Sequence, residues 1–83
     1  HDTVLSSVSY TLSADVEDLR LLGSDNLTGT GNDRNNVLIG NGGSNLLTGA
    51  SGNDTLQGGG GDDNMRGGAG NDVYGVDSVG DIV

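Results

Sequence analysis

A nine-residue pattern of polar and apolar positions runs through the chain from Gly31 onward. The first five units each begin with six residues rich in glycine and polar side chains and end with three residues whose middle member is apolar, and a sixth, degenerate unit covers residues 76–83. The apolar residues at position eight are Leu38, Leu47, Leu56, Met65, Tyr74 and Val83. Position six always carries an acid or its amide, namely Asn36, Asn45, Asp54, Asp63, Asp72 and Asp81. Repeats in fixed phase, each with its own apolar residue, predict a solenoid of stacked units rather than a disordered linker.

The last three residues of each unit predict a short strand that follows a six-residue turn. Side chains alternate between the two faces of a strand, so position eight points inward and positions seven and nine point outward. Each turn reverses the chain, so two units make one full coil and every second turn stacks on the same edge. We therefore expect Asn36, Asp54 and Asp72 on one edge. Position six of the other three units, Asn45, Asp63 and Asp81, should line the opposite edge.

The segment before the repeats has a different pattern. No glycine precedes Gly23, and alternating apolar and polar residues predict short strands at Val8–Leu12 and Leu19–Leu21. The polar residues between these strands predict a connector with room for one helical turn. We therefore predict two parts: residues 1–30 form lead-in strands and irregular coil, and residues 31–83 form a roll of about three coils.

Composition narrows the chemistry to a hard cation. Cysteine is absent and His1 is the one histidine, which excludes thiolate sites and any site that needs several imidazoles. A metal would therefore need oxygen ligands, which calcium prefers. Eleven of the 12 acids are aspartate, as suits short ligand-bearing loops. The net charge of −9 argues against nucleic acid as a partner, and no apolar run reaches membrane-spanning length.

The glycines of the turns fit the same chemistry. A turn that aims several carbonyls at one ion must adopt positive φ, which glycine does at little cost. Stacked turns should lie about 4.8 Å apart, and calcium, with ligands at about 2.4 Å, fits between two stacked carboxylates. A phosphate-binding loop is the alternative interpretation of glycine-rich runs, but this chain has no lysine and no strand–GxGxxG–helix unit.

The units GGGGDDNMR and GGAGNDVYG, residues 58–66 and 67–75, resemble the RTX or hemolysin-type calcium-binding repeat GGxGxDxUx. The unit GASGNDTLQ departs from that pattern at Ala50, and the units over residues 31–39 and 40–48 carry asparagine at position six. The resemblance implies an all-β fold, a right-handed parallel β-roll or β-solenoid with several calcium ions between stacked turns.

The resemblance also implies ligands. In this family one turn supplies its Asp and the carbonyls of positions two and four, and the next turn on the same edge supplies its Asp and the carbonyls of positions one and three. The best-formed site would use Ala50, Gly52, Asp54, Gly67, Ala69 and Asp72. A second, whose later turn lacks the glycines, would use Gly59, Gly61, Asp63, Val76, Ser78 and Asp81. A third, weaker because Asn45 is neutral, would use Asn41, Gly43, Asn45, Gly58, Gly60 and Asp63.

The start of the repeats leaves alternatives open. The spacing from Leu27 to Leu38 exceeds the repeat period by two, which indicates an insertion. Either the first turn begins at Gly31, or residues 29–33 form the true turn and Asp33 is a ligand. Candidate roles also stay open for Asp25 and Asp77. Asp2, Asp15, Asp18 and Asp62 are expected to be surface charges.

The resemblance implies a calcium-binding module of a bacterial protein exported by type I secretion, folding on calcium outside the cell. Neighbouring repeats of a longer array would be its other partners. Two alternatives remain: an accessory domain of a secreted protease, lipase or alginate epimerase, or an adhesin or glycan-binding repeat. No constellation of Ser, His and Asp in this sequence predicts catalysis, so we expect no enzyme activity from this segment itself.

Overall fold

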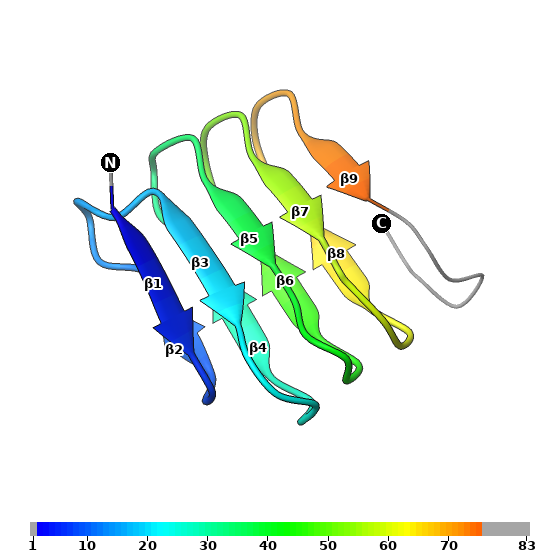
Figure 1. The fold of residues 1–83 in the computed structure, drawn as a ribbon. Coiled ribbons are helices and arrows are strands. Elements are labelled where there is room, and N and C mark those ends of the chain that lie inside the picture. The colour runs from blue at the N-terminus through cyan, green and yellow to red at the C-terminus, as the bar shows by residue number, and fades with distance from the viewer. Residues whose placement is uncertain (1, 76–83) are drawn as a thin grey trace.

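A computed structural model of the chain describes residues 2–75 and contains nine short strands in that range (Figure 1). Turns and bends connect them, and no helix occurs among the described residues. The strands are β1 (Thr3–Ser6), β2 (Tyr10–Thr11), β3 (Asp18–Leu21), β4 (Thr28–Thr30), β5 (Val37–Ile39), β6 (Leu46–Thr48), β7 (Thr55–Gln57), β8 (Asn64–Arg66) and β9 (Val73–Gly75).

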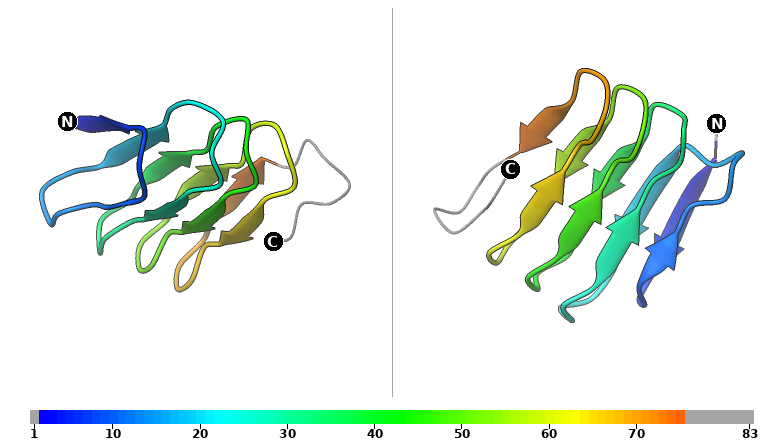
Figure 2. Two further views of the ribbon diagram at one scale, coloured as in Figure 1. Left: turned by 90° about the horizontal axis from the view of Figure 1, so that it is seen from below. Right: turned by 180° about the vertical axis from the view of Figure 1, so that it is seen from behind.

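Successive strands alternate between two parallel sheets. One sheet has the order β1-β3-β5-β7-β9 and the other β2-β4-β6-β8, and every pairing is parallel. Figure 2 shows the two sheets as opposite walls of a flattened coil, with the turns along its two edges. The chain is therefore a β-solenoid, as the nine-residue period predicts, and it has about four turns.

The register gives the length of each coil. From β4 onward, paired residues are separated by two repeat units, as in Thr28↔Leu46 and Thr55↔Val73. The earlier coils are irregular, because the step from Thr3 to its partner Asp18 is shorter than two units and the step from Asp18 to Val37 is slightly longer. The predicted half-coil of one unit is therefore confirmed for the repeats.

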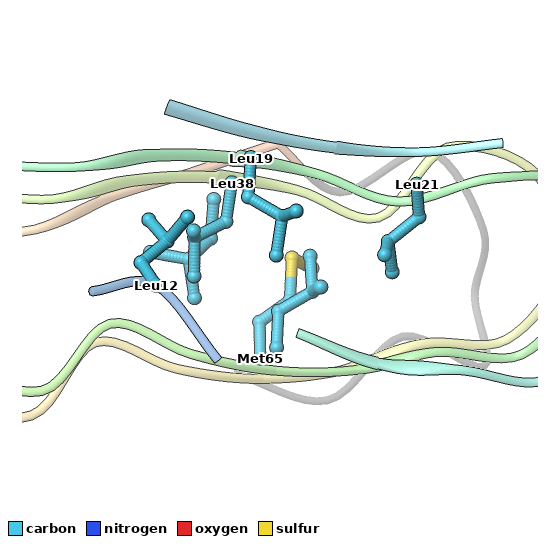
Figure 3. Close-up of a cluster of buried hydrophobic side chains, with 7 residues drawn as sticks. Leu12, Leu19, Leu21, Leu38 and Met65 are labelled. Carbon is cyan, nitrogen blue, oxygen red and sulfur yellow. The ribbon is translucent and has the colours of Figure 1, made fainter. Parts of the chain in front are cut away.

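The core is a column of single side chains between the two sheets. Position eight fills it with Leu38, Leu47, Leu56 and Met65, each with 0% of its surface exposed, and Tyr74 packs against them. The lead-in adds Leu12, Leu19 and Leu21 to the same hydrophobic cluster, with Leu19 beside Leu38 and Leu21 set apart from the stack (Figure 3). Each coil of the repeats thus buries one apolar side chain per strand, and most of this small chain's hydrophobic stabilisation comes from this column.

The predicted insertion between Leu27 and Leu38 is wrong. Gly29, not Leu27, is the inward residue of β4, and it precedes Leu38 by one repeat period. A Cβ atom at Gly29 would lie 3.0 Å from Leu19 Cδ2 and 3.2 Å from Leu47 Cδ2. The neighbouring leucines fill the space that a side chain would need, so the period continues through a residue without one.

The lead-in differs from prediction in detail. β1 was not predicted, the strand expected at Val8–Leu12 is limited to Tyr10–Thr11, and the connector before β3 contains a turn but no helix. The division into residues 1–30 and 31–83 stays a prediction, and both parts contribute strands to the same two sheets. Residues 2–75 include no helix long and apolar enough to cross a membrane.

Candidate metal sites between stacked turns

The side chains at position six turn into the molecule, although they are polar. Asn36, Asn45, Asp54 and Asp63 are each no more than 2% exposed. Every second one stacks on the same edge: the backbone N–H of Asn36 donates to Asp54 Oδ1 (2.7 Å), and that of Asn45 to Asp63 Oδ1 (2.7 Å). The N–H of Asp54 likewise donates to Asp72 Oδ1 (2.8 Å). These bonds confirm the predicted stacks; Asp81 lies outside the described residues.

Asp54 carries a buried oxygen that calls for a cation. Its Oδ1 accepts the bond from Asn36, but its Oδ2 is buried and has no hydrogen-bond partner. Burial raises the pKa of Asp54 above its ordinary 3.8; the Asn36 bond opposes this shift, and the charge of Asp72 adds to it. In the ion-free fold, the stabilising contribution of the protonated group is complete below pH 3.8 and is lost as pH rises through the raised pKa. A cation beside Oδ2 would remove this cost at neutral pH.

The backbone of the later turns is left-handed at alternating positions, and these positions lie against carbonyls of the preceding turn. Positions two and four adopt left-handed φ in three turns, at Ala50 (69°), Gly52 (93°), Gly59 (78°), Gly61 (79°), Gly68 (78°) and Gly70 (95°). The carbonyls at the same positions of the preceding stacked turn lie close against these residues. A Cβ at Gly59 would lie 2.7 Å from Asn41 O, and one at Gly61 would lie 2.7 Å from Gly43 O. Carbonyl oxygens of one turn therefore face the next turn on the same edge.

Carboxylates alone form no metal site within residues 2–75. Among the described residues, no group of three or more His, Cys, Asp or Glu side chains is close enough to hold an ion. An ion between stacked turns must therefore combine a few carboxylates with backbone carbonyls, a mixed oxygen set that calcium accepts.

A family profile of the RTX calcium-binding nonapeptide repeat, comprising four copies, matches residues 29–54 and 39–74. Together these matches span residues 29–74, more than half of the 83-residue chain. The chain belongs to this RTX family. RTX repeats bind calcium, and the presence of several repeats implies several ions. Searches of curated proteins and of solved structures found no match.

The RTX turns bring the predicted ligand sets together to different extents. The set built on Asp54 and Asp72 lies on two stacked turns of one edge, and the set built on Asn45 and Asp63 lies on two stacked turns of the other. The remaining set has Asp63 and its glycines on one turn, while its other half, residues 76–81, lies outside the described residues. The individual ligand roles stay predictions.

The alternative turn at the start of the RTX repeats is wrong. Thr28–Thr30 is strand β4, so the turn begins at Gly31 and Asp33 stands at its third position with an exposed side chain. Its role as a ligand stays a prediction. Asp25 and Asp62 are also exposed, as expected for Asp62. Asp77 lies outside the described residues.

Position five of the RTX turns has a role that the sequence analysis missed. The N–H of Asn53 donates to Asn35 Oδ1 (2.8 Å), and the N–H of Asn71 donates to Asn53 Oδ1 (2.8 Å). On the other edge, Ser44 N–H donates to Asn26 Oδ1 (2.8 Å). Exposed asparagines thus form a ladder along one edge. The recurrence of asparagine at position five of every second unit was the signal that could have revealed it.

Proposed function

We propose that this chain is a calcium-dependent RTX β-roll module of a secreted bacterial protein, and that calcium completes its folding outside the cell. The observation that carries the proposal is Asp54 Oδ2, an anionic oxygen buried without a hydrogen-bond partner. An unpaired buried carboxylate opposes folding at neutral pH unless a cation lies beside it.

The charge of the whole chain supports the same conclusion. A net charge of −9 on 83 residues repels itself when the chain becomes compact, and each bound calcium removes two negative charges. Metal binding and folding are then linked, because a site assembled from stacked turns does not exist in the unfolded chain.

The expected affinity explains why folding would wait for export. Extracellular calcium modules typically bind with dissociation constants of about 10⁻⁴–10⁻³ M. Many ligands proposed here are neutral carbonyls, which favours this weak range. Because cytosolic free calcium is far lower, the module would remain incompletely folded inside the cell, in a form that a type I secretion channel can thread.

The rest of the parent protein is a separate proposal. Neighbouring repeats of a longer RTX array are proposed as partners. The same module would also serve a secreted protease, lipase or epimerase as an accessory domain. For glycan binding the described part offers little aromatic surface: Tyr10 is 37% exposed, and the hydroxyl of Tyr74 accepts a bond from Gly67 N–H (2.8 Å).

A calcium titration followed by far-ultraviolet circular dichroism tests the proposal. We expect the β-sheet signal to increase with a midpoint at about 10⁻⁴–10⁻³ M calcium. Magnesium at the same concentration should have little effect, because it requires a small octahedral site and keeps its waters. A midpoint below about 1 µM, or equal folding with magnesium, would contradict the proposal.

A further inference from the structure

The turns are of two kinds. Three of them, residues 49–54, 58–63 and 67–72, have left-handed φ at positions two and four, and we call them Gly turns. The two earlier ones, residues 31–36 and 40–45, have no positive φ and carry asparagine at both position two and position six. We call these the Asn turns. Each Asn turn stacks on a lead-in turn, residues 13–17 on one edge and 22–27 on the other.

On the first edge, the amides of the Asn turn donate to the carbonyls of the lead-in turn. Asn32 Nδ2 donates to Ser13 O (2.6 Å) and Val16 O (2.7 Å). Asn36 Nδ2 donates to Glu17 O (3.0 Å) and Val16 O (3.3 Å). The carbonyls that would otherwise face a cation are therefore supplied with N–H donors from the protein itself.

An arginine also bridges the space between this Asn turn and the lead-in turn, and we call the space between two stacked turns a gap. Arg34 Nε donates to Ala14 O (2.7 Å), and its guanidinium lies 3.6 Å from Asp15 Oδ1 and 4.0 Å from Glu17 Oε2. Arg34 occupies position four, where each Gly turn has glycine. Its positive charge disfavours a divalent cation in this gap, because like charges repel at short range.

The second edge follows the same rule with longer bonds. Asn41 Nδ2 donates to Leu22 O (3.1 Å), and Asn45 Nδ2 donates to Leu27 O (3.4 Å) and Asp25 O (3.5 Å). Hydrogen bonds weaken with distance, so the asparagine bonds of this edge are the weaker set.

In both position-six asparagines, the side-chain oxygen and the side-chain nitrogen are hydrogen-bonded. Asn36 Oδ1 accepts from Asn32 N–H of its own turn (2.9 Å), and Asn45 Oδ1 accepts from Asn41 N–H (2.9 Å). Each amide therefore has its acceptor and its donor engaged at once. The side chain of an aspartate at position six has no N–H to donate, and Asp54 Oδ2 accordingly has no hydrogen-bond partner.

We propose that side-chain N–H groups of the Asn turns take the place of calcium in the two gaps that join them to the lead-in turns. Calcium is then required only where a Gly turn stacks on the turn before it, and the lead-in with the two Asn turns forms an ion-independent N-terminal cap. This inference rests on the proposed calcium-dependent folding and restricts it to part of the roll. Coils that bind calcium between their turns would then stack on this cap one after another.

Hydrogen exchange of single amides tests the proposal on the intact chain. The N–H groups of Val37 and Leu46 bond across the gaps between the lead-in turns and the Asn turns (3.1 and 3.1 Å), and those of Asn64 and Val73 bond across gaps whose later turn is a Gly turn (2.8 and 2.8 Å). In chelator, we expect Val37 and Leu46 to exchange on the order of tenfold or more slowly than Asn64 and Val73. Millimolar calcium should protect all four.

Two outcomes separate this inference from the proposed function. Loss of protection at Val37 and Leu46 together with Asn64 and Val73 in chelator would overturn the cap but leave calcium-dependent folding intact. Full protection of all four in chelator would instead overturn the proposed function.

A matched pair of variants tests whether the side chain of Asn36 is responsible for the protection of Val37 in chelator. Asn36→Asp removes two N–H donors and puts a carboxylate against carbonyl oxygens, so Val37 should lose its protection in chelator. Asn71→Asp makes the same change at an exposed position five of the same edge and should leave Val37 protected. Continued protection of Val37 in Asn36→Asp would overturn the role assigned to the amide.

Discussion

At the scale of single residues, the side chain at position six decides whether a turn needs a cation. The difference is one atom, the amide nitrogen of asparagine or the second carboxylate oxygen of aspartate. Asn36 and Asp54 are both 1% exposed and occupy equivalent places in stacked turns, but the amide can donate to neighbouring carbonyls and the carboxylate cannot. The raised pKa of Asp54 reflects the cost of burying its charge without a cation. The choice between asparagine and aspartate is therefore a choice between a hydrogen bond and an ion.

Asp54→Asn should weaken calcium-driven folding. The amide oxygen can still accept the bond from Asn36, but the charge that holds the ion is lost, and this turn has Ala50 rather than a second asparagine at position two to supply further N–H donors. We expect the calcium midpoint to rise by about tenfold, which corresponds to about 1.4 kcal/mol. Circular dichroism against free calcium measures the midpoint.

Asp62→Asn is the control for this experiment. It makes the same change at a position-five side chain that is exposed, so its midpoint should stay close to that of the original chain. Equal shifts for the two variants would show that net charge, rather than the buried ligand, sets the calcium requirement.

At the scale of elements, the geometry of the Gly turns depends on left-handed backbone at alternating positions. Gly59 and Gly61 have φ of 78° and 79°, whereas Gly60 between them does not have positive φ. Glycine adopts this region freely, and a residue with a Cβ does so at a cost. Close approach to the preceding turn adds a second constraint at the same positions.

Gly61→Ala should therefore destabilise the module by about 1–3 kcal/mol. Its Cβ would be strained by the positive φ and would lie 2.7 Å from Gly43 O. Urea unfolding in saturating calcium measures the free energy of unfolding.

Gly60→Ala is the matched control in the neighbouring residue. Its Cβ would meet nothing closer than Gly42 Cα at 3.7 Å, an ordinary contact, so the free energy of unfolding should change little. If the two alanine variants were equally stable, the assignment of left-handed geometry to position four would be wrong.

At the scale of the whole molecule, the core and the ion sites depend on the same stacking. Leu56 is fully buried in the column of inward side chains, and Asp54 lies just before it in the same unit. Leu56 is part of strand β7, and Asp54 lies at the end of the turn that leads into this strand. A coil that packs its leucine into the core therefore also brings its carboxylate to the stacked edge. We therefore propose that folding, core burial and calcium binding are coupled through each coil.

Leu56→Ala should raise the calcium requirement although it removes no ligand. Truncating a buried leucine costs about 2–5 kcal/mol, and the linkage between folding and binding converts that loss into a higher calcium midpoint. Val73→Ala, at a side chain that is 62% exposed, is the control and should shift the midpoint far less. An unchanged midpoint in Leu56→Ala would mean that the ion sites form independently of the core.

The sequence by itself determined the repeating unit. The spacing of Leu38, Leu47, Leu56 and Met65 predicts the strands, the inward positions and the stacked position-six residues, because side-chain alternation and turn chemistry are local properties. Prediction from the spacing of apolar side chains failed where an inward position has no side chain or where the coil length departs from the repeat. Gly29 is an inward residue with no side chain to reveal it, and the coils that pair β1 with β3 and β3 with β5 depart from the length of two units.

The tertiary structure alone decided what each polar side chain faces. Asn36 contacts Glu17 of the lead-in, and Asn53 accepts a bond from Asn71 of a later repeat. Such partners meet only when coils stack in register. For Asn36 that register depends on the irregular lead-in, because its partner Glu17 lies there. Sequence pattern therefore predicts calcium chemistry in general, whereas the stacked coils decide which gaps have a buried oxygen without a partner and which are closed by N–H donors.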